Sequence, residues 1–302
     1  MNLERTSCNG DQSDQWTRSV LIWATINNYE AKIQKNYIRC LELMSVDDVK
    51  VFKDMFPRDD ACHLAASAGR LCLVKYFAKH KYPRDERTCA CAAEKGFLHI
   101  IDWASQNLFP WDHRTSNAAT KKGDLKLLKW LFENGCPVNW KVSEIAAEEG
   151  HLHILCWIVN TNVQMSQCAC NKAARNGHIH ILEWAQSCGI RGSRLSMSLD
   201  AACSGKIEIL EWVLKNGYPW NNVASLFVAK NGDLNMLKWM YDNQHTWHVH
   251  THMWAIKHGH LHILKFASQI GHPMDAAECH REALWCDHEH IADWFWLKMF
   301  EA

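Results

Sequence analysis

The segment from Gly150 to Trp157 reads GHLHILCW, and it places His151 and His153 two residues apart, followed by Cys156. Imidazole and thiolate groups are the ligands that a structural zinc site uses most often. Two Cys-x-Cys pairs, at residues 89 and 91 and at residues 168 and 170, add candidate thiolates. These residue types make a metal centre the first chemistry to consider.

The same phrase returns as GHIHILEW from Gly177 and as GHLHILKF from Gly259, which makes it part of a repeat. The glycines that precede such apolar phrases are spaced by 27 or 28 residues: Gly69, Gly96, Gly123, Gly150, Gly177, Gly205, Gly232 and Gly259. Asp287 stands in the glycine's place in a ninth, degenerate copy. Self-similarity at such a fixed period is typical of solenoids and repeat arrays.

Other residue types keep the same register and predict two helices in each copy. Seven positions after each glycine, or after Asp287, an aromatic residue follows: Tyr76, Trp103, Trp130, Trp157, Trp184, Trp212, Trp239, Phe266 and Trp294. Leu152, Ile154 and Leu155 illustrate the apolar face of the helix that begins after the glycine. Glycines such as Gly135 end that helix, and N-cap residues such as Asp112 begin the next one.

One helical hairpin cannot bury its apolar face alone, but stacked hairpins can. We therefore predict an all-α fold, an α-solenoid of about nine helix–turn–helix repeats without β-fingers, over residues 58–302. Residues 1–57 are predicted to form a polar tail and a helical N-terminal cap. The degenerate copy around Asp287 is predicted to form a helical C-terminal cap.

The copies resemble ankyrin repeats. Cys62 to Gly69 reads CHLAASAG and is similar to the first-helix pattern of that family, and GHLHIL is similar to the start of its second helix. The period of 27 is shorter than the family's usual length of about 33, and the missing residues are those of the β-turn finger. Segments such as NGYPWN at 216–221 are similar to short ankyrin-like arrays of large DNA viruses of protists and of some algae and oomycetes. The resemblance implies a viral or protist interaction protein.

Related arrays can carry a short helical ubiquitin-ligase adaptor motif before the first repeat. Residues 15–57 show apolar periodicity but not the leucine–proline start of that motif. We interpret the segment as a plain cap, with recruitment of an adaptor as the alternative.

The register argues against the metal hypothesis. Other copies fill the two histidine positions with lysine, aspartate, asparagine or glutamate, and side chains two apart on a helix point in different directions. We expect these histidines to bridge neighbouring repeats at the helix starts. Cys89 and Cys170 share a position with Ser116 and Ser143, which indicates a small buried residue. No metal and no cofactor is predicted.

Two groups of side chains are candidates for binding a partner. The aromatic column shares a face with the buried aliphatic residues and is predicted to be core. One group is the loop tryptophans Trp111, Trp220 and Trp247. These side chains are either binding hot spots or contacts between adjacent loops. The variable solvent-side positions of the first helices predict a protein footprint that is least polar at Leu195, Leu199, Leu226 and Met253, with Trp140 at its edge. Ordinary surface variation is the alternative.

The composition narrows the functional classes. The formal net charge is zero, with 33 basic and 33 acidic residues, which indicates no electrostatic footprint for nucleic acid or for a membrane surface. No apolar run approaches the roughly 20 residues of a membrane span, and the chain start lacks the apolar centre of a signal peptide. A cytoplasmic location is expected, in the host cytoplasm if the chain is viral, with the virus particle as an alternative. No phosphate loop, HExxH or Gly-x-Ser-x-Gly motif occurs.

The resulting hypothesis is a non-catalytic protein–protein interaction module that docks a host or cellular protein. Nucleic acid, membranes and small-molecule substrates are not expected as partners. The alternatives are a self-assembling structural component of a virus particle and a metal-binding protein that uses its cysteines and histidines.

Overall fold

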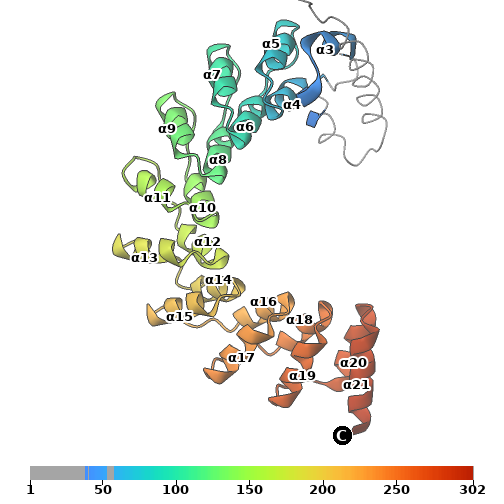
Figure 1. Cartoon of the computed structure of the whole chain (residues 1–302). Coiled ribbons are helices and arrows are strands. Elements are labelled where there is room, and N and C mark those ends of the chain that lie inside the picture. Colours follow the sequence, from blue (N-terminus) through green and yellow to red (C-terminus); the bar gives the residue numbers. More distant parts are fainter. Residues whose placement is uncertain (1–37, 40, 53–57, 302) are drawn as a thin grey trace, which may run out of the picture. The chain divides into compact units, whose positions relative to one another are not determined.

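The computed structural model describes residues 38–39, 41–52 and 58–301. Within these ranges every regular element is an α-helix, as predicted (Figure 1). The chain divides into two compact units, Met1–Val142 and Ser143–Ala302. The predicted polar tail lies outside the described residues, and so does most of the predicted N-terminal cap. The described part of that cap contains α3 (Val46–Phe52). Its assignment as a separate segment stays a prediction.

Nine helical hairpins follow one another in the described ranges, in agreement with the predicted number of repeats. The first helices of the hairpins are α4 (Ala61–Ser67), α6 (Glu86–Lys95), α8 (His113–Lys122), α10 (Lys141–Glu148), α12 (Ala169–Asn176), α14 (Met197–Cys203), α16 (Ala224–Asn231), α18 (Thr251–Lys257) and α20 (Ala276–Trp285). The second helices are α5 (Leu71–Lys79), α7 (Leu98–Gln106), α9 (Leu125–Glu133), α11 (Leu152–Val159), α13 (Ile179–Ser187), α15 (Ile207–Lys215), α17 (Leu234–Asp242), α19 (Leu261–Gln269) and α21 (Glu289–Glu301).

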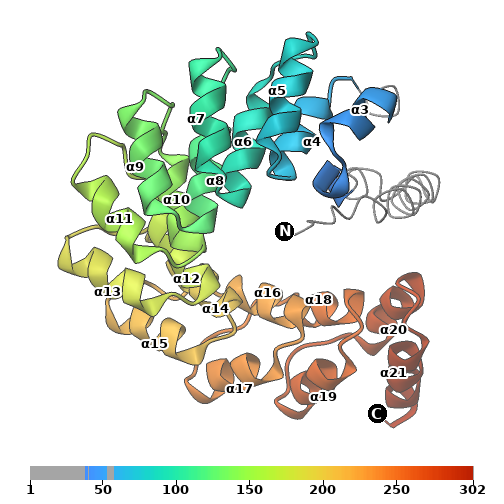
Figure 2. The ribbon, with the colours of Figure 1, turned by 45° about the horizontal axis from the view of Figure 1, so that its top comes forward.

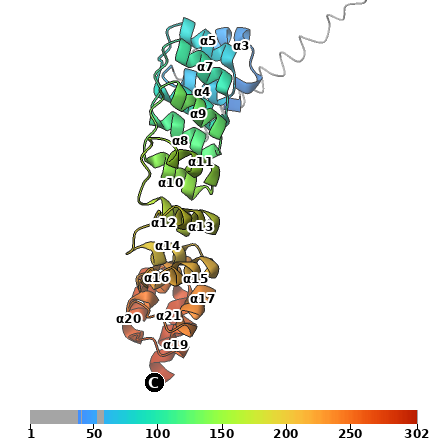
Figure 3. The ribbon, with the colours of Figure 1, turned by 90° about the vertical axis from the view of Figure 1, so that its left-hand side faces the viewer.

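Within each unit the first helices stack on one another, and the second helices form a parallel layer. In the first unit α4, α6 and α8 lie side by side, with α5, α7 and α9 as their second layer (Figure 2). In the second unit α14, α16 and α18 stack in the same way, and Figure 3 shows α12 and α13 paired at one level. Each unit is therefore a helical-repeat solenoid.

The core of each hairpin comes from fixed positions of the repeat. In α9 the buried residues are Leu127, Leu128 and Leu131, which lie four, five and eight positions after the repeat glycine. Small residues such as Ala119 of α8 are fully buried and let the first helices approach their neighbours closely. Burial of one such aliphatic side chain contributes about 1.5–3 kcal/mol.

The aromatic column is not the buried core that its position predicted. All nine of its members, from Tyr76 to Trp294, are half-buried. The aromatic residues come after the buried aliphatic positions of the second helix. The residue that follows each of them, such as Phe77 or Ala104, is the one that is fully buried. The ring of Trp103 instead lies at the edge, where Phe109 and Lys75 contact it. The column is a half-exposed aromatic margin of the core.

Glycines and aspartates set the helix ends where the register placed them. Gly96 and Gly232 end first helices with φ of +81° and +77°, in the left-handed region that favours glycine. The Asp112 carboxylate accepts a hydrogen bond from the Arg114 N–H at the start of α8, and Asp233 accepts one from the Met236 N–H at the start of α17. Asp287 replaces the glycine in the last repeat and still adopts φ of +58°.

Two glycines in the second unit form a matched pair for testing these turns. Gly217 has a φ of +79°, and a Cβ added there would have no atom within 4 Å. For Gly217→Ala we therefore expect the free energy of unfolding to fall by about 1 kcal/mol, from backbone strain alone. In Gly232→Ala the Cβ would also lie 2.9 Å from Cε1 of His260, so the loss should be larger by about 1 kcal/mol. Urea unfolding of both variants measures the difference. Equal losses would show that the His260 contact is not formed.

The last hairpin, α20 and α21, is helical, and its role as a C-terminal cap stays a prediction. In α21 the side chains of Trp296, Leu297 and Phe300 are exposed, and Trp285 at the end of α20 is exposed as well. The polar residues that occupy the position of Trp285 in other repeats include Glu94 of α6. The exposed surface of this hairpin therefore combines these apolar side chains with the exposed Glu289, His290 and Asp293.

Candidate binding surface

The histidines of the GHxH phrase connect neighbouring repeats, as expected from the register. In the second unit Nε2 of His178 lies 3.0 Å from the carbonyl oxygen of Glu148, and Nε2 of His180 lies 3.3 Å from that of Gly150. His260 and His262 make the same contacts three repeats later, with the carbonyl oxygens of Lys230 and Gly232. Because a carbonyl oxygen only accepts, each imidazole donates to a carbonyl oxygen at the end of a first helix or of the glycine that follows it.

Lysine and arginine replace histidine in this role at other repeats. Nζ of Lys206 donates to the carbonyl oxygen of Gly177, and Arg70 donates to the carbonyl oxygens of Glu42 and Met44. A donor near the last carbonyls of a helix is favourable whatever side chain carries it. Among the described residues, no group of three His, Cys, Asp or Glu side chains is placed to hold a metal ion. The phrase is therefore a structural contact between repeats.

The cysteines of the repeat column are buried. Cys89 and Cys170 lie in the core, and burial raises the pKa of the Cys89 thiol to about 12 and that of Cys170 to about 11. Serines at the same position use their hydroxyl differently: Ser116 and Ser198 donate to the carbonyl oxygens of Pro137 and Pro219 in the following loop. The column requires a small side chain, as predicted, and cysteine fills it without a thiolate.

The loop tryptophans pack against neighbouring loops or helices. Trp220 stacks on His245 with ring centroids 4.5 Å apart, and its Nε1 donates to the carbonyl oxygen of Thr246. Trp111 makes an edge contact with Trp130, and Trp247 packs against Phe266 and His272. All three are half-buried. A binding role for Trp111, Trp220 and Trp247 stays a prediction.

The predicted footprint falls on three consecutive first helices of the second unit. Leu199 of α14, Leu226 of α16 and Met253 of α18 occupy equivalent, half-buried positions, and Leu195 before α14 is 78% exposed. The residues that follow Leu226 and Met253 are aromatic. They are Phe227 of α16 and Trp254 of α18, and their ring centroids lie 6.0 Å apart. We call Leu199, Leu226, Phe227, Met253 and Trp254 the apolar stripe.

Trp140, the predicted edge of the footprint, lies in the first unit and is 48% exposed. It precedes α10 and therefore starts the first helix of the fourth hairpin. Its part in a footprint stays a prediction.

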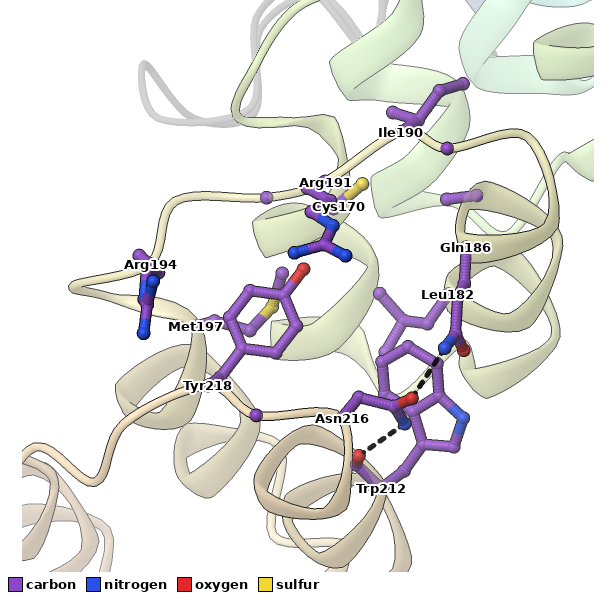
Figure 4. Close-up of a pocket in the computed structure, with 14 residues that line it drawn as sticks. Cys170, Leu182, Gln186, Ile190, Arg191, Arg194, Met197, Trp212, Asn216 and Tyr218 are labelled. Carbon is purple, nitrogen blue, oxygen red and sulfur yellow. Dashed lines mark hydrogen bonds between the residues drawn. The ribbon is translucent and has the colours of Figure 1, made fainter.

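A second feature of this unit has no counterpart among the predicted residues. The loop at 188–196, between α13 and α14, borders a pocket of about 520 Å³ that Arg191, Arg194, Trp212 and Tyr218 help to line (Figure 4). Two signals in the sequence mark this place. Arg191 stands where other repeats have proline, and the repeat is 28 rather than 27 residues long.

No helix of the described residues is long and apolar enough to cross a membrane. Comparison with models of known protein families gives no match, and no curated protein matches the chain.

Solved structures match the fold at low similarity. One is the pentatricopeptide repeat protein PPR10 in complex with an 18-nt psaJ RNA element, with a TM-score of 0.45 and 13% identity over 95% of this chain and 51% of that chain. A cysteine-substituted form of that protein with the same RNA element gives the same values. The maize protein alone gives a TM-score of 0.39 and 12% identity over 94% of this chain and 51% of that chain. The chain thus spans about half the length of these structures, and the likeness concerns the helical-repeat fold alone.

The prediction that nucleic acid can be excluded as a partner is wrong. Two of the matched structures are complexes with RNA. A formal net charge of zero sums over the whole chain, whereas a binding surface depends on the charges that lie on it. Net charge alone therefore does not decide between a protein and an RNA partner.

Proposed function

We propose that the chain is a non-catalytic, repeat-based binding module, and that the apolar stripe of its second unit docks a protein partner. One observation carries the proposal. Leu199, Leu226 and Met253 occupy one register position on three stacked helices, where the first unit has Ala90 and Asn117. Such a half-buried apolar surface on neighbouring first helices fits a partner with apolar side chains of its own.

Three details of the stripe support a protein partner. Its members are aliphatic or aromatic, and aromatic side chains and methionine are enriched at protein interfaces. Lys230 lies over the Trp254 ring at 5.9 Å, so the stripe has a polar margin. The repeats themselves are fixed by buried positions and by contacts between neighbours, which leaves the stripe free to vary with the partner. The proposal includes the finer assignment of the repeats as short, ankyrin-like units.

The test is capture of a partner from a eukaryotic cell lysate by the full chain and by a stripe variant with Leu199→Asp, Leu226→Asp and Met253→Asp. We expect the variant to retain at least about tenfold less of the partner, because each acidic side chain must be desolvated on docking. Quantitative mass spectrometry of the retained proteins measures the change, and circular dichroism confirms that the variant is helical.

A control variant places acidic groups on second helices of the same unit. Val159→Asp in α11 and Tyr241→Asp in α17 change side chains that are exposed and apolar but lie outside the stripe. Capture by this control should equal that of the native chain. Retention that is lost after nuclease treatment, or lost equally with both variants, would contradict a protein-docking stripe, and the former result would favour RNA.

A further inference from the structure

The pocket beside the loop at 188–196 is separate from the apolar stripe and lies between two consecutive hairpins, α12–α13 and α14–α15. Leu182 and Gln186 reach it from α13, Trp212 from α15, and Asn216 and Tyr218 from the turn after α15 (Figure 4). Its volume of about 520 Å³ lies within the range of small-ligand sites.

The loop that carries the arginines is held in place. The backbone N–H of Ser193 donates to Oδ1 of buried Asn171 at 2.8 Å, and the Ile190 N–H donates to the carbonyl oxygen of Ala185 at 2.8 Å. A Cβ at Gly192 would collide with Met197 and lie 2.8 Å from Oδ1 of Asn171. The wall of the pocket is therefore fixed by packing and hydrogen bonds before a ligand arrives.

Four polar side chains around the pocket are donors without partners among the described residues, whereas Gln186 and Asn216 are hydrogen-bonded to each other. The side chains of Arg191 and Arg194 form no ion pair or hydrogen bond among the described residues, and neither do the Tyr218 hydroxyl and the Trp212 indole N–H. Figure 4 shows Arg191 pointing into the pocket near the hydroxyl end of Tyr218. The lining contains no Asp or Glu, so its two guanidinium groups are not neutralised. Such a set of donors is matched by an oxyanion.

The remaining lining residues recognise a different part of the ligand. Leu182, Ile190 and Met197 are apolar, and the Trp212 ring adds an aromatic surface. A free phosphate ion would leave this surface uncovered, whereas an oxyanion attached to an apolar or aromatic body would cover it. The pocket is bounded by the loop at 188–196 and the turn at 216–218, which fits a terminal group better than a phosphodiester within a continuous strand.

We propose that this pocket binds a phosphate monoester carried on an aromatic or apolar body. Arg191 and Arg194 contact the phosphate oxygens, Tyr218 donates its hydroxyl to them, and Trp212 packs against the body. A dianionic monoester offers more acceptor oxygens to this set of donors than a carboxylate does. The ester is either a small molecule or a phosphorylated side chain of a protein. The site does not depend on the apolar stripe.

Isothermal titration of the full chain with phenyl phosphate tests the proposal, with phenol, benzoate and inorganic phosphate as comparisons. We expect phenyl phosphate to bind, inorganic phosphate and benzoate to bind at least about fivefold more weakly, and phenol not to bind. The change Arg191→Gln together with Arg194→Gln should weaken phenyl phosphate binding by at least about tenfold, since each charge-assisted contact is lost. Tyr218→Phe should weaken it by about threefold.

Arg281→Gln is the matched control, because Arg281 is an exposed arginine of α20 away from the pocket, and it should leave binding unchanged. A tyrosine-phosphorylated peptide that binds more tightly than phenyl phosphate identifies a protein source, and equal affinity identifies a small-molecule source. The proposal is overturned if phenyl phosphate does not bind, if phenol binds equally well, or if the double arginine variant binds like the native chain. Tighter binding of single-stranded RNA at the same arginines would also overturn it.

Discussion

Replacement of Asn171 by alanine is expected to lower the free energy of unfolding by about 2 kcal/mol. The Asn171 amide is buried and makes three connections: Nδ2 donates to Oγ of Ser196 at 3.0 Å and to Oδ2 of Asp200 at 2.8 Å, and Oδ1 accepts from Ser193. Alanine removes all three and leaves the Ser193 N–H without its acceptor. Urea unfolding followed by circular dichroism measures the loss.

Asn176→Ala is the matched control on the same helix. Its amide is exposed and donates only to the carbonyl oxygen of Lys172, so we expect a loss below about 0.5 kcal/mol. Since Asn171 also holds the loop of Arg191, Asn171→Ala should weaken phenyl phosphate binding, whereas the control should not. A loss equal to that of the control would show that the buried network is not formed.

Acidification is expected to destabilise the chain through His252. This imidazole of α18 is buried, and burial, followed by the neighbouring His272 and His250, lowers its pKa from 6.5 to about 4. The unfolded chain then binds a proton more readily than the native state. The contribution of His252 to stability is therefore complete above about pH 6.5 and is lost as the pH falls from there towards about 4.

The expected size of this loss is about 2 kcal/mol between about pH 7 and about pH 5. Because the chain has 19 histidines, the effect is isolated by comparing the native chain with His252→Phe, which removes the titrating group and keeps a ring against His272. Urea unfolding at a series of pH values should show a shallower loss for the variant. Identical pH profiles would mean that His252 does not carry a lowered pKa.

The architecture could be predicted because each feature of a repeat is fixed by a local cause. Gly96 ends a helix through its own left-handed backbone, and Asp112 begins one through its own side chain. Such signals recur in most copies at a fixed spacing, so the number and order of the hairpins followed from the spacing. The exchange of His178 with lysine in the same column likewise indicated a contact between repeats rather than a metal ligand.

The features that the sequence did not predict depend on degrees of burial and on distant neighbours. The aromatic column follows apolar positions of the second helix, but residues one position further on lie deeper, so Trp103 is only half-buried. The pocket of Arg191 requires Asn171, which fixes the loop from another helix, and no local pattern announces that contact. The exclusion of nucleic acid failed for a related reason, because total charge does not report local surfaces.

The apolar stripe, on the first helices of the second unit, is proposed as the docking surface for a protein. Site-specific photo-crosslinking tests it most directly, with p-benzoylphenylalanine placed at position 226 of α16 and, as the matched control, at exposed position 235 of the adjoining α17. After irradiation in lysate, position 226 is expected to give a discrete crosslinked protein that position 235 does not give. Crosslinks from position 235 alone, or crosslinks from position 226 to RNA instead of protein, would contradict the claim.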